Sequence, residues 1–241
     1  MIVIPSIELS LKNRPEFLHK LSVFAHTYGC ADRPALIWQC RALETVEFDV
    51  GQKPLIEALA GGSGTESEAG WWSAFRSGHP PVFTFDGLGA TAVDYGSGWM
   101  SEVHSDGHVI AGLWDFPEEK GQKFLFDWHA DAFTDFALLA RALYNAAGYA
   151  NSSEFTCTLL AAEQLAFVRS DDRSRRAPRK ISRPFLQWRI RKCNSEADLE
   201  TTAIVMAREL PRAFGVAGSR PTARTTYTWL SRSEIPRQPS Q

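Results

Sequence analysis

Runs of apolar residues with helical or alternating spacing divide the chain into a predicted series of helices and strands. The most apolar run, residues 134–147, has the period of a helix and only a narrow polar stripe, so it must be covered on most sides. Thr134 is expected to cap its first turn and Gly148 to end it, since glycine adopts positive φ freely. With predicted strands at residues 123–128 and 154–160, this helix forms the expected centre of the fold.

A β-α-β pattern opens the chain. It consists of an alternating strand, an amphipathic helix that follows the predicted cap Asn13 and ends before Gly29, and a second strand. These three elements are expected at residues 6–12, 15–28 and 35–43. A further strand and a short helix are then expected at residues 45–50 and 53–60.

The clearest hairpin lies at residues 99–116, and the length of its turn decides where its polar side chains point. Asp106-Gly107 favours a two-residue turn, which sends His104 and His108 to opposite faces. A three-residue turn would instead place the two imidazoles directly opposite each other, with Glu102 on the same face. We favour the two-residue turn because it gives better apolar partners. Its cross-strand pairs are Ser105–His108, Val103–Ile110 and Trp99–Trp114.

One more strand and one more helix are expected near the C-terminus. In the strand at residues 184–193, three apolar side chains alternate with three polar ones, so the two sets should face opposite sides. The apolar set is Leu186, Trp188 and Ile190, and the polar set is Gln187, Arg189 and Arg191. A helix begins after Ser195, where Asp198 completes the spacing of a capping box, and Gly215 closes this helix.

Together these elements predict an α+β fold, with an N-terminal β-α-β part followed by a larger, mostly antiparallel sheet with two covering helices. The N-terminal part is expected to span residues 1–78 and the antiparallel body residues 79–216, because His79-Pro80-Pro81 breaks the chain between them. The polar, proline-containing residues 217–241 are expected to form a largely disordered tail.

Composition narrows the class of protein without identifying it. The chain has 241 residues, of which 44% are apolar, so a sizeable core is expected; its net charge of −2 gives no global attraction to nucleic acid or membrane. The four cysteines form no disulfide or zinc pattern. No run approaches the roughly 18 apolar residues of a membrane helix, and the N-terminus does not resemble a signal peptide. We therefore expect a soluble, cytoplasmic protein without a membrane partner or a cofactor.

Three residues of the predicted hairpin have the composition of a metal site. Glu102, His104 and His108, called here the hairpin group, would hold a metal if the three-residue turn formed, because two imidazoles and a carboxylate are metal ligands. The favoured two-residue turn separates the two histidines. The expectation is therefore solvated loop histidines and no metal.

A second group has the composition of a catalytic site. Asp127, His129 and Asp131, called here the His129 group, would share one face of an extended chain, where a carboxylate orients the imidazole as a general base. No nucleophile motif accompanies them. The simpler interpretation is that Asp131 or Thr134 caps the following helix and that His129 is a hydrogen-bonded polar residue.

Basic residues concentrate in the segment that leads into the strand at residues 184–193. Nine of the 26 Lys and Arg residues lie there, and the acidic residues of the segment, Asp171 and Asp172, are at its front edge. A basic loop beside a strand that projects arginines outward is a plausible phosphate-binding surface. Its residues are Arg173, Arg175, Arg176, Arg179, Lys180, Arg183, Arg189, Arg191 and Lys192.

Residues 8–29 resemble the opening of Schlafen-type AlbA_2 domains, in which a Glu-x-Lys-type strand precedes a helix that ends in Ala-Phe-Ala-Asn-Thr-x-Gly-Gly. The positions that match are Glu8, Lys12, Leu21, Ser22, Phe24, Ala25, Thr27 and Gly29. His26 and Cys30 stand where the family has Asn and the second Gly. The resemblance implies an α/β module that binds or processes nucleic acid.

The functional hypothesis is a non-catalytic binding or regulatory protein whose ligand is nucleic acid, bound through its phosphates by residues 173–192. An acidic protein is the other partner that such a basic surface fits. Two alternatives stay open. The first is an enzyme that uses the His129 group or a metal at the hairpin group, and the second is a subunit of a larger protein assembly.

Overall fold

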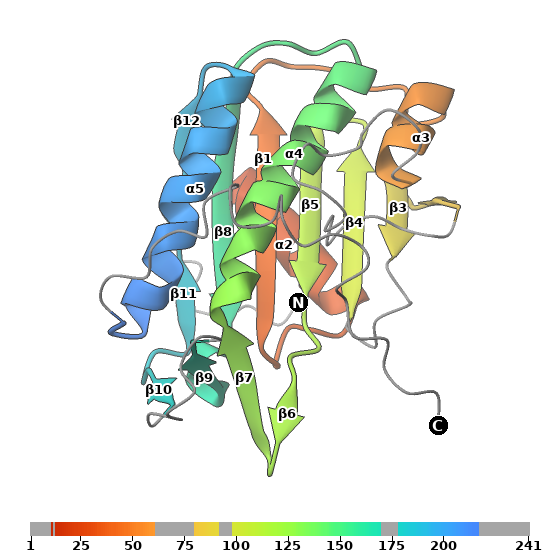
Figure 1. The fold of residues 1–241 in the computed structure, drawn as a ribbon. Helices are drawn as coiled ribbons and strands as arrows, with labels where there is room; N and C mark the ends of the chain where they lie inside the picture. Colours follow the sequence, from red (N-terminus) through yellow and green to blue (C-terminus); the bar gives the residue numbers. More distant parts are fainter. Residues whose placement is uncertain (1–10, 12, 61–79, 92–97, 170–177, 217–241) are drawn as a thin grey trace, which may run out of the picture.

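The computed structural model describes residues 11, 13–60, 80–91, 98–169 and 178–216. Within these residues, eight strands form one sheet in which every pairing is antiparallel, in the order β11-β8-β1-β5-β4-β3-β2, with β12 also paired to β8 (Figure 1). Its strands are β1 (Ala35–Ala42), β2 (Val82–Phe83), β3 (Gly87–Thr91), β4 (Trp99–His104), β5 (His108–Leu113), β8 (Ser153–Leu160), β11 (Phe185–Gln187) and β12 (Arg191–Cys193).

A smaller sheet lies at one end of the large one. Among the described residues it has four strands in the order β10-β9-β7-β6, and its β7–β9 pair is parallel. These strands are β6 (Glu118–Glu119), β7 (Gln122–Phe126), β9 (Leu165–Val168) and β10 (Arg179–Lys180). Two short 3-10 helices follow strands of the two sheets. In the smaller sheet, η2 (Asp127–Ala130) connects β7 to α4, and η3 (Ala162–Gln164) connects β8 of the large sheet to β9 of the smaller one.

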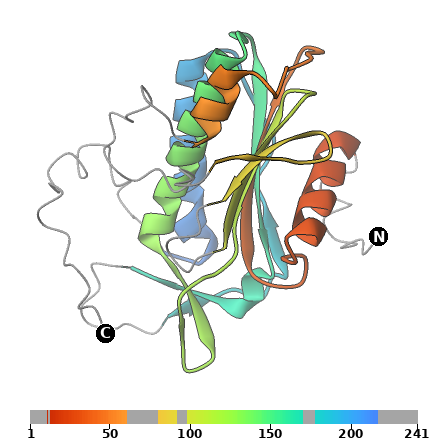
Figure 2. The ribbon, with the colours of Figure 1, turned by 90° about the vertical axis from the view of Figure 1, so that its right-hand side faces the viewer.

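Helices cover both faces of the large sheet, so the fold has three layers (Figure 2). Helix α2 (Pro15–Thr27) lies on one face, and α3 (Lys53–Ala60), α4 (Asp131–Ala146) and α5 (Glu196–Ala213) lie on the other. The predicted α+β class with a large, mostly antiparallel sheet is therefore confirmed. None of the described helices is long and apolar enough to cross a membrane.

The predicted central helix is present as α4, but its first turn differs from the prediction. Helix α4 begins at Asp131, with Ala130 rather than Thr134 at the N-cap position. The earlier start follows from η2, which coils the chain where an extended strand end was expected. At the other end Gly148 has φ +70°, which confirms its predicted role. The buried face of α4 packs Phe133 and Phe136 around Trp38 of β1.

The favoured register of the β4–β5 hairpin is wrong. Val103 pairs with Val109 and Trp99 with Leu113, so the turn has three residues, Ser105-Asp106-Gly107. Gly107 takes φ +75°, the left-handed conformation that a three-residue turn requires. Its carbonyl oxygen accepts hydrogen bonds from Tyr144 Oη at 3.1 Å and from the Ala42 amide at 3.2 Å. These contacts from α4 and β1 fix a turn that the local sequence alone does not select.

The strand predicted at residues 184–193 is divided by a β-bulge. Gln187 pairs with Thr158 and Arg191 with Phe155, so three residues of the edge strand stand opposite two residues of β8. The extra residue reverses the alternation. Leu186 and Trp188 therefore pack on the α4–α5 side, whereas Ile190 packs against the cluster under α2. The prediction that Leu186, Trp188 and Ile190 share one face is wrong for Ile190.

Other predictions have mixed outcomes. Residues 45–50 form no strand, and the N-cap of α2 is Arg14 rather than Asn13. Strand β1, from the predicted N-terminal part, lies in the centre of the same sheet as strands of the predicted body. The predicted boundary at 78/79, the tail 217–241 and nearly all of the strand at 6–12 lie outside the described residues.

The hairpin turn gives a first testable prediction. A Cβ on Gly107 would lie 2.4 Å from Val46 Cγ2, in addition to the strain of φ +75°. Gly107→Ala should therefore lower the free energy of unfolding by about 2–4 kcal/mol in urea titrations. Gly121→Ala is the matched control, because Gly121 has φ +77° but no atom within 4 Å of its Cβ position. The control should lose about 1–2 kcal/mol; equal losses would contradict the packing role of the turn.

Candidate functional site

The predicted basic surface is only partly within the described chain. Arg173, Arg175 and Arg176 lie outside the described residues. Two residues of β10, Arg179 and Lys180, are exposed on the smaller sheet. The remaining members lie on the edge strand of the large sheet or just before it and are at least partly exposed; they are Arg183, Arg189, Arg191 and Lys192.

An open groove of about 600 Å³ follows this edge strand, with the C-terminal half of α5 as its other wall. Arg183, Arg189 and Arg191 line the groove, so the fold brings together three of the nine predicted residues. Arg179, Lys180 and Lys192 do not line it. From α5 the groove receives Glu209 and Ala213, which the sequence analysis did not single out.

The strand wall of the groove is held firmly in place. Trp188 is buried against Phe133 and donates its indole N–H to the Met206 carbonyl at 3.2 Å. The side-chain amide of Gln187 donates to the Cys157 carbonyl at 3.0 Å and to Thr156 Oγ1 at 2.8 Å. These contacts tie β11 to β8 and α5, so the arginines before and after them project from a rigid backbone.

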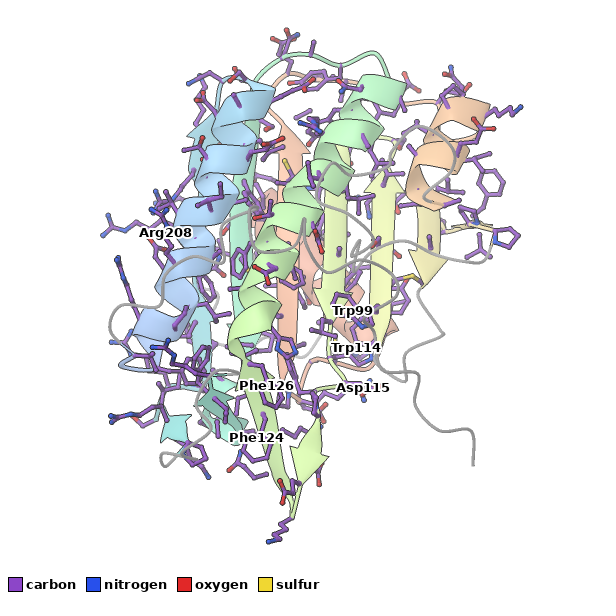
Figure 3. The ribbon with its side chains drawn as sticks, in the orientation of Figure 1. Trp99, Trp114, Asp115, Phe124, Phe126 and Arg208 are labelled. Atoms are coloured by element: carbon purple, nitrogen blue, oxygen red, sulfur yellow. The ribbon has the colours of Figure 1, made fainter. Side chains whose placement is uncertain are left out.

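Positive charge dominates this edge of the molecule. Arg191 is neutralised by Glu209 of α5, with Nη2 and Oε1 2.7 Å apart. Arg183 and Arg189 form no ion pair with any residue that the structure describes. Arg208 points outward from α5 at the side of the molecule where the edge strand lies (Figure 3). Arg212 follows it one helical turn later. Helix α5 thus adds cations that only the folded arrangement places beside the strand.

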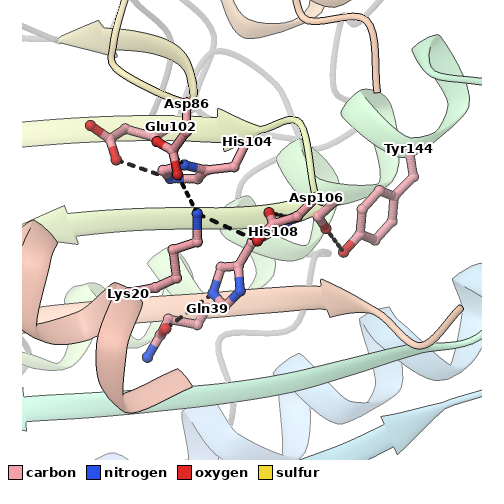
Figure 4. Close-up of polar contacts among 9 residues, drawn as sticks. Lys20, Gln39, Asp86, Glu102, His104, Asp106, His108 and Tyr144 are labelled. Atoms are coloured by element: carbon pink, nitrogen blue, oxygen red, sulfur yellow. Dashed lines mark hydrogen bonds and ion pairs between the residues drawn. The ribbon is translucent and has the colours of Figure 1, made fainter. Parts of the chain in front are cut away.

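The hairpin group is brought together, contrary to the favoured register. His104 and His108 face each other across β4 and β5 with ring centroids 6.4 Å apart, and Glu102 lies beside His104 (Figure 4). His104 Nδ1 lies 2.9 Å from Asp86 Oδ1, and His104 Nε2 lies 3.1 Å from Glu102 Oε2. Both nitrogens of His104 therefore already have carboxylate partners. The expectation of solvated loop histidines is wrong, since both rings are buried.

His108 is also engaged in the protein interior. Its Nε2 lies 3.1 Å from Gln39 Oε1, and its ring meets Phe17 of α2 edge to face. Burial, together with the nearby charges of His104 and Lys20, lowers the pKa of His108 well below its usual value, so the ring is neutral. Within the described residues, no group of three or more His, Cys, Asp or Glu side chains has a metal-binding arrangement.

Helix α2 is attached to the sheet through this polar network. Lys20 of α2 lies 2.6 Å from Asp86 and 3.4 Å from Asp106, and the Tyr28 hydroxyl donates to Glu102 (Figure 4 shows the lysine contacts). Burial disfavours ionisation of Asp86, but the hydrogen bond from Lys20 and the adjacent His104 ring outweigh it and lower the pKa of this carboxyl. Where α2 covers polar side chains of the sheet and its loops, Lys20 and Tyr28 thus serve as their hydrogen-bonding and ionic partners.

The His129 group does not have the predicted extended geometry. Its residues lie in η2 and in the first turn of α4, so the chain between Asp127 and Asp131 is coiled. His129 is buried, and its Nδ1 accepts the Phe126 backbone N–H at 3.0 Å. Burial lowers the pKa of His129 to about 3, although the Phe126 carbonyl oxygen, 3.2 Å from Nδ1, favours the protonated ring. The neutral, buried imidazole therefore packs from η2 against Phe126, the last residue of β7.

His129 should make the fold sensitive to mild acid. Because its pKa falls from 6.5 to about 3 on folding, the unfolded chain binds a proton that the folded chain does not between these values. Its contribution to stability is complete above pH 6.5 and should fall by about 3 kcal/mol as the pH drops to about 4. In His129→Asn, an amide oxygen replaces Nδ1 without titrating. Between pH 7 and about 4, the free energy of unfolding of this variant in urea should depend less on pH than that of the native chain. Parallel curves for the two proteins would contradict this role of His129.

The polar network gives another prediction. His104→Leu leaves the buried Glu102 carboxylate with Tyr28 but without its imidazole partner, which should cost about 3 kcal/mol. The double variant Glu102→Leu/His104→Leu removes the isolated charge as well. It should be more stable than the single variant by at least about 1 kcal/mol in urea unfolding at pH 7. If the double variant is less stable than His104→Leu, then the Glu102 carboxylate does not need the His104 imidazole to be tolerated in the protein interior.

Comparisons of the chain with protein-family models, with curated proteins and with solved structures gave no match. They therefore do not test the resemblance of residues 8–29 to Schlafen-type AlbA_2 domains. The helix that carries most of that resemblance is α2, and Gly29 ends it at φ +61°. Residues 8–10 and 12 lie outside the described chain, so the resemblance stays a prediction.

Proposed function

We propose that this protein is a non-catalytic binding protein that holds nucleic acid through its phosphates in the groove between the edge strand and α5. The observation that carries the proposal is the convergence of Arg183, Arg189 and Arg191 in that one groove. Guanidinium groups bind phosphate oxygens with paired hydrogen bonds, so arginine suits this ligand better than lysine. The outward-pointing Arg208 extends the basic surface beyond the groove.

The backbone of the edge supports binding by side chains. An open strand edge often takes up a peptide as an additional strand, but a bulge interrupts the regular backbone spacing that this requires. Here the bulge lies between Gln187 and Arg191, at the middle of the groove. A ligand with regularly spaced negative charges fits such an edge better than an extended peptide does.

The local charge distribution sets the kind of binding to expect. The chain as a whole carries a net charge of −2, so attraction to a polyanion comes from this edge and not from the whole protein. Contacts to phosphates release counterions without reading bases. Binding should therefore be largely independent of sequence and should weaken steeply with salt.

The other hypotheses fit the described residues less well. The histidines of both candidate catalytic groups are buried and hydrogen-bonded in structural roles. An acidic protein partner would use the same groove, and it is distinguished by the competitor in the experiment below. A role as an assembly subunit has weaker support, from the exposed side chains of Val82, Phe83 and Phe85 at the β2–β3 end of the sheet.

Charge removal in the groove tests the proposal. Arg189→Gln should weaken binding of a fluorescein-labelled oligothymidylate of about 12 nucleotides by about threefold to tenfold at ~50 mM salt. It should also reduce the steepness of log K against log salt by about 0.7, the value for one lost contact to a single strand. Fluorescence anisotropy measures both quantities.

Lys53→Gln is the matched control, since Lys53 is an exposed cation of α3 at the opposite edge of the sheet. It should leave the affinity and the salt slope unchanged. Absence of any oligonucleotide binding by the native chain at low salt would end the proposal. Stronger displacement by polyglutamate than by unlabelled oligothymidylate would assign the groove to an acidic protein instead.

A further inference from the structure

We propose that Glu209 occupies the place of a ligand phosphate in the groove, and that binding transfers Arg191 from Glu209 to that phosphate. This inference rests on the proposed function and adds its regulation. In the free protein the carboxylate lowers the affinity of the groove and keeps Arg191 extended and ready for a phosphate. Glu209 is thus an internal competitor for the ligand.

The geometry of the pair supports this exchange. Arg191 Nη2 and Glu209 Oε1 are 2.7 Å apart, and both residues line the groove. Their side chains are 38% and 40% exposed, so a ligand can reach the contact from solvent. The pair of Arg14 and Glu154 differs, because the Glu154 side chain is only 6% exposed and the contact ties residues far apart in the chain.

The energies also favour exchange. An exposed ion pair changes an equilibrium by no more than about fivefold, so giving it up costs little. A phosphate offers the same guanidinium a stronger, charge-assisted contact. The two anions repel each other at one cation, so they do not occupy it together.

Glu209 has a second partner within reach once it leaves Arg191. Arg212 follows it by three residues on α5, a spacing at which side chains on a helix surface meet. Among the described residues Arg212 forms no ion pair, so it is available to Glu209. The carboxylate can therefore move along its own helix without remaining unpaired.

The experiment measures anisotropy of the same labelled oligothymidylate with the full chain. Glu209→Gln keeps the size of the side chain and removes its charge, and it should tighten binding by about twofold to fivefold. Glu57→Gln is the matched control: it makes the same charge change and also breaks an ion pair with a cation of its own helix, Lys53. It lies on α3, away from the groove, and should change the affinity by less than about twofold.

The same Glu209→Gln change, made in a protein that lacks Arg191, separates exchange at Arg191 from simple repulsion between Glu209 and the ligand. In Arg191→Gln, the further change Glu209→Gln should tighten binding by less than about twofold, since no cation is left to release. An equal gain in both backgrounds, or a gain no larger than that of Glu57→Gln, would overturn the inference while the native chain still binds. Failure of the native chain to bind oligothymidylate at all would instead overturn the proposed function. Far-ultraviolet circular dichroism of each variant verifies that the fold is retained.

Discussion

The single extra residue between β11 and β12 is the constraint on which the candidate site depends. Strand β8 pairs with β1 along its whole length and is buried at every position, so it cannot shift to accommodate the extra residue. The edge strand must bulge instead. The bulge turns Arg191 from the face of Gln187 to the face covered by α5, where it meets Glu209. Regular pairing would have placed this guanidinium on the other face of the sheet, and the groove would then lack the Arg191–Glu209 ion pair.

The two faces of the large sheet are covered in different ways, and this explains why its polar residues misled the sequence analysis. On the α4–α5 face, aromatic side chains such as Trp38 and Phe136 fill the space between sheet and helices. On the α2 face, apolar packing continues only part of the way, and hydrogen bonds among Lys20, Asp86 and His104 continue the contact. The buried polar groups that resemble a metal site in the sequence are here partners of one another.

The sequence was informative where local chemistry decides the structure. Gly148 ends α4, and Ser195 caps α5 by accepting the Asp198 amide at 3.2 Å, because both roles depend on neighbouring residues alone. The hairpin register was missed because Tyr144, remote in the sequence, holds the turn through the Gly107 carbonyl. The partner of Arg191 was missed for the same reason: Glu209 meets it only through the packing of α5.

Charge and backbone geometry act together at the edge of the sheet. An unprotected edge strand pairs with other chains, and both bulges and exposed charges prevent this. The same two features make the edge a binding surface of a particular kind, since a backbone that cannot extend a sheet leaves recognition to the side chains. Two of these side chains, Arg183 and Arg189, have no carboxylate partner among the described residues, whereas Arg191 has one that α5 supplies. An edge built only for protection would not need a groove, nor an acid placed to hold one cation in it.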